Sequence, residues 1–232
     1  KHSKKHINPF YATHKIKIPF RGLLIGSSGA GKTNLLMNII SVMSAGKGKS
    51  NKKGTFNHIY VYTRAREPIY DFLTEELGPA FITIRYSLND LKTFDEDKYY
   101  GQSLVVFDDM VNEPQKDQQC IKELYIRGRK IAGGISLLYL TQSYFPVPKI
   151  IRLQCQYVFI LKVSGVRDLK LIMSEYNLGA TTDELTQMYN YACNSNEFGN
   201  FFLIDLEAPQ SRTFRKNFNE ILNIKGQASI CI

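Results

Sequence analysis

Residues 23–33 read LLIGSSGAGKT, an apolar strand that runs directly into the pattern G-x-x-x-x-G-K-T. This is the pattern of a phosphate-binding loop, in which a glycine-rich turn joins a strand to the start of a helix. Its three glycines allow successive backbone N–H groups to point at phosphate oxygens. The stretch therefore predicts a nucleotide site formed by Gly26, Ser27, Ser28, Gly29, Ala30, Gly31, Lys32 and Thr33.

The residues on both sides of this loop have the pattern that it requires. Phe20 to Ile25 is typical of a buried strand, and apolar residues after the loop recur at helical spacing, at Leu36, Ile39, Ile40 and Met43. A serine- and glycine-rich turn without this role is the alternative, but it would not need these flanks. In a phosphate-binding loop, Lys32 supplies a positive charge for the β- and γ-phosphates, and Thr33 offers its hydroxyl to Mg²⁺.

A second informative stretch is residues 104–109, LVVFDD, four apolar residues followed by two carboxylates. Four apolar residues in a row are typical of a fully buried strand, and ligands of open α/β sheets bind at the carboxyl ends of such strands. Asp108 is placed to hold Mg²⁺ together with Thr33. Asp109 is then expected to face the attacking water, as general base or as the residue that positions it.

A further buried strand, Ile135 to Thr141, brings Gln142 to the same edge of the sheet. An amide at this place can sense a γ-phosphate or orient water, and the alternative is an ordinary polar residue at a strand end. The helix expected before this strand starts after Pro114 and ends in the basic run 127–130, RGRK.

The remaining pattern predicts strands that alternate with helices. Strands are expected at 58–63, 81–86, 157–161, 201–206 and 212–218, the last two as a pair, and helices at 68–77, 166–176 and 182–193, with a short helix and loop within 90–100. Such alternation is typical of an α/β fold with a mainly parallel sheet covered by helices on both faces. The chain of 232 residues is long enough for one substantial core.

Three segments are expected along the chain: a basic, flexible N-terminal arm at 1–17, a single domain at 18–224 and a short C-terminal tail at 225–232. Three of the four histidines of the sequence fall in the arm without metal-site spacing, and we expect them to be solvated; they are His2, His6 and His14.

Positive charge is concentrated at the N-terminal end of the chain. The net charge is +9, and residues 1–53 contain eleven Lys or Arg and no Asp or Glu. This asymmetry favours a polyanionic partner such as double-stranded DNA bound without regard to its sequence, the alternative being a solvated basic tail. A glycine- and lysine-rich loop contributes the candidate DNA contacts Lys47, Lys49, Lys52 and Lys53, unless it is only a solvated connector.

Composition excludes several classes of protein. Cys120, Cys155, Cys193 and Cys231 lie far apart, which argues against a zinc site or a redox pair and is typical of thiols in a reducing compartment. No apolar run approaches the roughly 20 residues of a membrane span, and the opening residues lack a signal-peptide pattern. We expect a soluble protein that needs no membrane.

The order of these motifs resembles the genome-packaging ATPases of double-stranded DNA viruses and virophages, within the FtsK/HerA superfamily. The resemblance extends from residue 18 to residue 218, and its most specific part is the combination of Arg-Gly-Arg, Leu-Thr-Gln-Ser-Tyr-Phe and Pro-Lys. The stretches that carry it are 19–33, 104–110, 126–129, 136–145, 148–152 and 201–206.

The resemblance implies a RecA-like core in which the Thr-Gln strand lies between the phosphate-loop strand and the Asp-Asp strand. It implies ATP and Mg²⁺ as cofactors, a homo-oligomeric ring (pentamer or hexamer) around double-stranded DNA, and a capsid or packaging-vertex component as partner. It also implies a location in the host cytoplasm, at the viral assembly site or in the virion. The expected function is an ATP-driven motor that packages DNA into a preformed capsid, with another FtsK/HerA-type pump or helicase as the alternative.

The resemblance also assigns roles to single residues. Gln142 becomes the polar sensor, and an arginine near the end of the preceding helix becomes the finger that reaches a neighbour's ATP, with Arg129 fitting best and Arg127 second. Asp109 stands where the superfamily more often has Glu, so Glu113 is a second candidate for the catalytic base.

Three rival functions also fit part of the sequence. A small P-loop nucleotide kinase would use Lys32 with several arginines, but it would have no use for the basic N-terminal quarter. A GTP-driven switch lacks its N-K-x-D base-reading motif in this sequence. A DNA-binding protein without enzymatic activity would leave Lys32, Asp108 and Asp109 unexplained.

Overall fold

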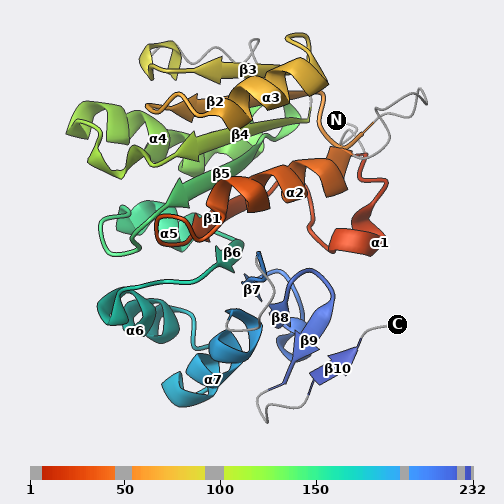
Figure 1. Ribbon diagram of the computed structural model, residues 1–232, viewed down its shortest axis with the longest axis vertical. Coiled ribbons are helices and arrows are strands. Elements are labelled where there is room, and N and C mark those ends of the chain that lie inside the picture. The colour runs from red at the N-terminus through yellow and green to blue at the C-terminus, as the bar shows by residue number, and fades with distance from the viewer. Residues whose placement is uncertain (1–6, 45–53, 92–101, 194–198, 224–227, 231–232) are drawn as a thin grey trace.

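A single twisted sheet runs through the molecule and separates two layers of helices (Figure 1). The computed structural model describes residues 7–44, 54–91, 102–193, 199–223 and 228–230. Within these ranges the sheet has ten strands in the order β10-β9-β8-β7-β6-β1-β5-β4-β2-β3. The first six strands of the chain are parallel to one another, and the last four add on in antiparallel fashion beyond β6.

The strands are short, as the apolar runs of the sequence predict. Their bounds are β1 Arg21–Ile25, β2 His58–Thr63, β3 Ile82–Arg85, β4 Ser103–Asp108, β5 Ser136–Thr141, β6 Tyr157–Ile160, β7 Phe202–Asp205, β8 Phe214–Lys216, β9 Glu220–Leu222 and β10 Ala228–Ile230. All residues of β1, β4 and β5 are buried, because helices cover both faces of these central strands.

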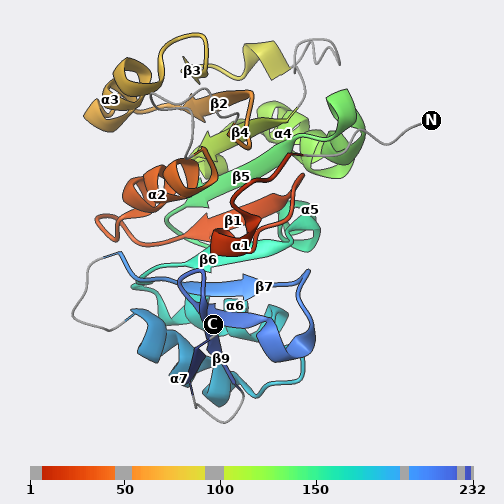
Figure 2. The same ribbon diagram turned by 90° about the vertical axis from the view of Figure 1, so that its right-hand side faces the viewer.

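Seven helices flank the sheet in the described part of the chain. They are α1 Tyr11–His14, α2 Lys32–Ser44, α3 Pro68–Leu77, α4 Gln115–Arg127, α5 Lys149–Gln154, α6 Val166–Glu175 and α7 Thr182–Cys193, with short 3-10 turns at η1 Asn89–Leu91, η3 Met110–Asn112, η4 Gly128–Gly133 and η5 Gln210–Arg212. Apolar residues of α2 and α3 pack on one face of the sheet, and those of α4 to α7 pack on the other (Figure 2).

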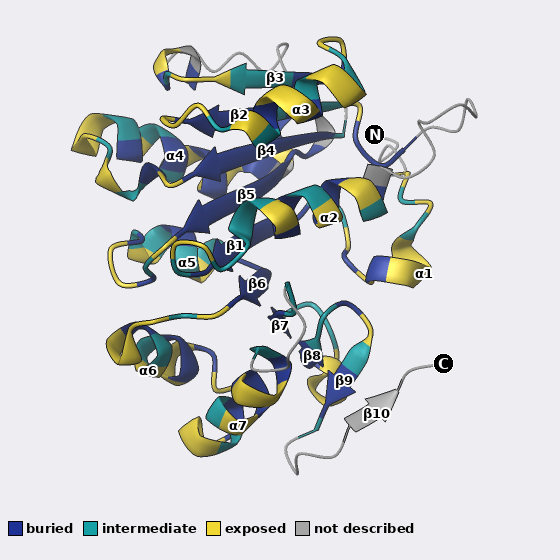
Figure 3. Ribbon diagram, viewed as in Figure 1, coloured by how far each residue is buried: buried dark blue, intermediate teal, exposed yellow. Residues whose placement is uncertain are grey.

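Alternation along β1 shows how the two layers divide the core. Leu23 belongs to the apolar cluster under α4 to α7, whereas Leu24 belongs to the cluster under α2 and α3. Successive side chains of a strand point to opposite faces, so both faces of this strand are apolar. The helices carry their exposed residues on their outer sides (Figure 3).

The strand order confirms the expected position of the Thr-Gln strand. β5 lies between β1 and β4, with Leu23 opposite Tyr139 on one side and Val106 opposite Leu138 on the other. The three strands are parallel, so their carboxyl ends meet at one edge of the sheet. In Figure 1 this edge is on the left, where the phosphate loop leaves β1.

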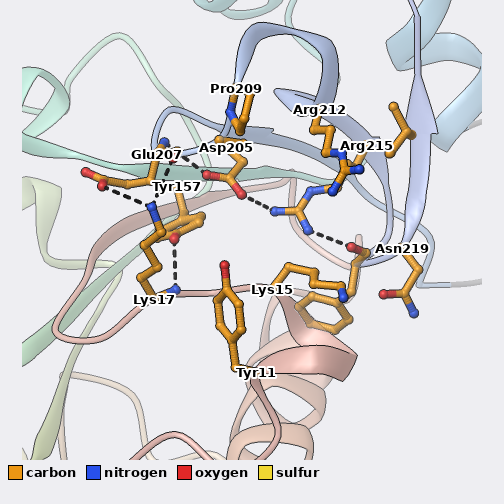
Figure 4. Close-up of a pocket in the computed structure, with 13 residues that line it drawn as sticks. Tyr11, Lys15, Lys17, Tyr157, Asp205, Glu207, Pro209, Arg212, Arg215 and Asn219 are labelled. Atoms are coloured by element: carbon orange, nitrogen blue, oxygen red, sulfur yellow. Dashed lines mark hydrogen bonds and ion pairs between the residues drawn. The ribbon is translucent and has the colours of Figure 1, made fainter. Parts of the chain in front are cut away.

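The expectation of a flexible arm at 1–17 was wrong for residues 7–17. This segment forms α1 and packs beside α2, and His14 and Ile16 are completely buried, so His14 is not solvated. The N–H of Lys17 donates a hydrogen bond of 2.9 Å to the Tyr157 hydroxyl (Figure 4). Residues 1–6, with His2 and His6, lie outside the described residues.

The N-terminal segment and the late strands enclose a small pocket of about 140 Å³ (Figure 4). Beside it, Arg215 forms a buried ion pair with Asp205 and also donates to the carbonyl of Phe218 at 2.7 Å. The ion pair joins β7 to β8, which form the late strand pair that the sequence predicts and are antiparallel. The expected tail at 225–232 contains β10, which extends the sheet by one strand.

The described helices are shorter or more polar than a helix that spans a membrane. Among these residues, no helix is both long enough and apolar enough to cross a bilayer.

Candidate nucleotide site

A pocket of about 470 Å³ opens at the carboxyl edge of the parallel strands. It lies between the phosphate loop, the tips of β2, β4 and β5, and the start of α3. Its lining consists of Ser28, Gly29, Gly31, Lys32, Thr33, Asn34, Thr63, Arg64, Ala65, Glu67, Asp108, Asp109 and Gln142. The structure therefore brings together the residues that the sequence predicts from three separate stretches, 26–33, 108–109 and 142.

The phosphate loop takes a backbone conformation that needs its glycines. Gly29 and Gly31 have positive φ angles of 73° and 93°, which residues with a side chain adopt only with strain. A Cβ atom on Gly26 would lie 2.9 Å from the Cβ of Leu161 on the neighbouring β6 side of the loop. The loop closes on itself through a 3.0 Å hydrogen bond from the N–H of Ala30 to the carbonyl of Ser27. It leads directly into α2, whose first-turn N–H groups have no partner within the helix and favour an anion.

Lys32 folds back over this loop. Its Nζ donates to the carbonyl oxygens of Gly26 at 3.0 Å and Ser27 at 3.4 Å. Partial burial lowers the pKa of Lys32, and the carboxylates of Asp109, Asp108 and Glu67 oppose this shift. The Lys32 ammonium is thus held at the loop by two neutral carbonyl oxygens. A negatively charged phosphate oxygen is a stronger acceptor and can replace them.

Asp108 ends β4 and is 7% exposed. Its Oδ2 accepts a hydrogen bond of 2.5 Å from the hydroxyl of Tyr70 in α3. Burial raises the pKa of Asp108, and the nearby carboxylates of Glu67 and Asp109 raise it further, whereas the Tyr70 hydroxyl and Lys32 lower it. A bound cation would stabilise the ionised form of this carboxylate, which its surroundings otherwise disfavour.

Asp109 and Gln142 lie side by side at the mouth of the pocket. The Gln142 Nε2 donates to the Asp109 Oδ2 at 2.7 Å. Asp109 adopts a left-handed conformation with φ of 54°, and its N–H donates to the carbonyl of Leu140 at 3.0 Å. This sharp turn after β4 leaves the Asp109 side chain exposed, while Asp108 remains buried.

Sequence reasoning missed Glu67 and Tyr70. Glu67 precedes α3, and its Oε2 accepts a 3.4 Å hydrogen bond from the hydroxyl of Thr33. β2 lies next to β4, so the loop that follows β2 opens into the same pocket. The expected strand at 58–63 indicates that its carboxyl end lies at this sheet edge, but not that the strand is next to β4.

Glu113, the second candidate for the catalytic base, pairs with Arg64. The Nε of Arg64 donates to the Glu113 Oε1 at 2.7 Å, and its Nη2 contacts the other carboxylate oxygen. Arg64 also donates to the carbonyl of Tyr86 at 2.9 Å. Arg64 lines the pocket and Glu113 does not. The ion pair with Glu113 holds the Arg64 side chain in its place at the pocket.

The two arginines expected to act on a neighbour belong to the end of α4 and to η4, which do not line this pocket. Arg127 ends α4 and is exposed, and Arg129 lies in η4, where the structure describes its backbone alone. η4 precedes β5, so it lies at the opposite edge of the sheet from Gln142. The four lysines of the basic loop lie outside the described residues; they are Lys47, Lys49, Lys52 and Lys53.

The oxygen atoms around the pocket suit a hard cation. Thr33, Asp108 and Glu67 offer hydroxyl and carboxylate oxygens, which are the donors that Mg²⁺ takes, usually together with phosphate oxygens and water. Over the described ranges, no group of three His, Cys, Asp or Glu residues could hold a metal ion on its own. These residues therefore fit a metal ion that arrives with a nucleotide.

Comparison with known proteins identifies the family to which the chain belongs. The family model described as Poxvirus A32 protein matches residues 8–205. The DNA packaging protein OPG160 of Variola virus is 28% identical over 150 residues, which cover 60% of this chain and 52% of the relative. The Monkeypox virus protein of the same name is also 28% identical, with 47% of its length covered. The chain thus spans about half the length of the curated relatives it matches.

Solved structures show the same fold. The genome packaging NTPase B204 from Sulfolobus turreted icosahedral virus 2, in complex with AMPPCP, superposes with a TM-score of 0.60 at 15% identity, covering 87% of this chain and 98% of that one. The cytoplasmic domain of the type VII secretion ATPase EccC of Thermomonospora curvata gives 0.56 at 13% identity, covering 82% of this chain and 24% of the other. The chain therefore shares the fold of these two proteins, an α/β fold with a mainly parallel sheet as the sequence predicts.

Proposed function

Because the chain belongs to the Poxvirus A32 protein family, we propose that it is an ATPase that drives double-stranded DNA into a viral capsid. The observation that carries the proposal is the meeting of Lys32, Asp108 and Gln142 at one edge of the sheet, around a pocket with a phosphate loop. The name DNA packaging protein, carried by the curated relatives, supports DNA as the moved substrate.

The residues divide the work of nucleotide binding. The N–H groups of the phosphate loop and Lys32 bind the phosphates, and Thr33 and Asp108 hold Mg²⁺. When bound, Mg²⁺ neutralises negative charge on the β- and γ-phosphate oxygens. Glu67 contacts Thr33 and adds negative charge on the metal side of the pocket.

Asp109 is the best candidate to position or deprotonate the attacking water. It is exposed at the pocket mouth, and the Gln142 amide fixes one of its oxygens while the other remains available. The carboxylate of Glu113 is occupied by Arg64 and does not line the pocket, so it is less well placed to contact the attacking water. The pair of Asp109 and Gln142 thus combines the base with the polar sensor.

The partners follow from charge and from the relatives. The basic residues at 1–53 favour sequence-independent contact with DNA phosphates, carried partly by Lys47, Lys49, Lys52 and Lys53. A homo-oligomeric ring would surround the duplex, with Arg129 or Arg127 reaching the ATP of the next subunit and a capsid component at the packaging vertex. Such a motor acts at viral assembly sites in the host cytoplasm.

The test of the ATPase proposal is Mg²⁺-dependent phosphate release from ATP by the purified protein. Lys32→Ala is expected to abolish release, and Lys116→Ala, which changes an exposed lysine of α4, is expected to leave it unchanged. Equal rates for Lys32→Ala and the parent would contradict the proposal. Phosphate transfer to an added nucleoside, without release, would instead favour the kinase.

A further inference from the structure

The first turn of α6 and the residue Ser164 before it contact two segments that adjoin the nucleotide site. Ser164, just before α6, donates from both its N–H and its hydroxyl to the Ser27 hydroxyl of the phosphate loop, each at 2.7 Å. One turn later, Asp168 contacts the loop that follows Gln142. The start of α6 thus lies against both the phosphate loop and the loop that follows Gln142.

Asp168 is the centre of the second contact. Its carboxylate accepts hydrogen bonds from the Ser143 hydroxyl at 2.6 Å, the Tyr144 N–H at 2.8 Å and the Phe145 N–H at 3.1 Å. Asp168 is 8% exposed, so these bonds are largely shielded from water. Hydrogen bonds to an ionised acceptor are stronger and shorter than neutral ones. Two of the three come from consecutive backbone N–H groups, which fixes the direction of the backbone.

Other contacts hold the same loop against α6. The Tyr144 hydroxyl donates to the Glu175 Oε2 at 2.5 Å, and the guanidinium of Arg167 lies 3.6 Å from the ring centre of Phe145. The contacts of Tyr144 and Phe145 with α6 hold the side chains of the loop, whereas Asp168 binds the backbone N–H groups of the loop. Removing the Asp168 charge therefore acts on the backbone next to Gln142.

We propose that Asp168 is a positioning residue for hydrolysis, which holds the loop 143–145 so that the Gln142 amide stays on Asp109. The inference rests on the proposed function of the site. Gln142 directly precedes the anchored residues, and its Nε2 lies 2.7 Å from the Asp109 Oδ2. Asp168 acts through Gln142 and contacts neither nucleotide nor metal.

The test is a double-mutant cycle with Asp168→Asn and Gln142→Ala. Asp168→Asn is expected to lower kcat about 10-fold with little change in the KM for ATP, because the phosphate loop and Lys32 are intact. In the Gln142→Ala background the same change is expected to alter kcat by less than about 2-fold, since the positioned amide is already gone. The matched control is Asp183→Asn, which removes an exposed carboxylate from the first turn of α7.

A second readout does not depend on activity. In Asp168→Asn, the amide hydrogens of Tyr144 and Phe145 are expected to exchange faster with solvent, with no change in α2. An unchanged kcat in Asp168→Asn, or an equal fold loss in both backgrounds, would overturn the positioning role while the ATPase proposal stands. A parent protein that hydrolyses no nucleotide would overturn the proposed function and this inference with it.

Discussion

The side-chain amide of Gln142, at the tip of β5, donates a 2.7 Å hydrogen bond to the carboxylate of Asp109, at the tip of β4. The two residues are 33 positions apart in the chain, and adjacent parallel strands bring them together. The contact ties the expected sensor to the expected base. A change in one of them should therefore change the chemical step through the other.

Asp109→Asn keeps the shape of the side chain and an oxygen that can accept the hydrogen bond from Gln142. The new amide, however, cannot take a proton from water. We expect kcat for ATP hydrolysis to fall about 100-fold or more, with nearly unchanged ATP affinity. Steady-state kinetics and the binding of a fluorescent ATP analogue measure the two quantities. Glu113→Gln is the comparison, and a larger loss of kcat there than in Asp109→Asn would transfer the role of base to Glu113.

Tyr70→Phe removes the hydroxyl that donates to the buried Asp108 at 2.5 Å. The carboxylate then loses a partner that burial prevents water from replacing fully. We expect the free energy of unfolding to fall by about 1–3 kcal/mol, measured by urea denaturation without nucleotide or metal. Tyr86→Phe changes an exposed tyrosine and should shift the urea midpoint little. Equal effects of the two changes would show that the hydrogen bond to Asp108 does not stabilise the fold.

His14 predicts a pH dependence of stability. Burial, with a smaller contribution from the Arg215 guanidinium, lowers the pKa of His14 from 6.5 to about 4. Between these values the unfolded chain binds the proton more tightly than the folded chain does. The free energy of unfolding should therefore fall as pH drops from 6.5 to about 4, by roughly 3 kcal/mol from this group at most.

The measurement compares urea denaturation of the parent and His14→Asn across this range of pH. Asn can still accept the 3.0 Å hydrogen bond that the Ile16 N–H donates to the His14 Nδ1, but it does not titrate. The parent should lose more stability than the variant as the pH falls. Parallel curves would mean that His14 does not titrate in this window.

Arg129 and Lys32 allow a test of a finger that acts between subunits. In phosphoryl transfer, a guanidinium supplied by a neighbouring subunit can raise kcat about 10³–10⁵-fold. Mixing the inactive variants Lys32→Ala and Arg129→Ala should restore part of the ATPase activity, because some interfaces then combine an intact phosphate loop with an intact arginine. Arg127→Ala, mixed in the same way, tests the second candidate. The absence of recovery in rings shown to be mixed would exclude Arg129 as the finger.

Local signals made much of the site predictable. The phosphate loop is one continuous motif, and Asp108 and Gln142 follow strands that are recognisable as apolar runs. The carboxyl ends of parallel strands meet at one edge, so the convergence of these residues follows from the order of the motifs along the chain. Helices with clear boundaries, such as Pro68–Leu77 and Thr182–Cys193, were predicted with the bounds that the structure has.

What the sequence did not reveal depends on contacts between distant parts of the chain. Glu67 reaches the pocket, and Tyr70 reaches Asp108, only because β2 lies beside β4, a strand order that local patterns do not specify. α1 is four residues long in a polar segment, and its His14 is buried by packing rather than by periodicity. β9 and β10 have three residues each, too few to show an alternating pattern.

The coupling of hydrolysis to DNA movement is tested most directly by displacement of a third-strand oligonucleotide from a linear duplex. With Mg²⁺ and ATP, the parent protein should displace the oligonucleotide after a lag that grows with its distance from the duplex end. Lys32→Ala should displace none. Hydrolysis of ATP without displacement, or displacement with a lag independent of distance, would contradict the account of this protein as a DNA-translocating motor.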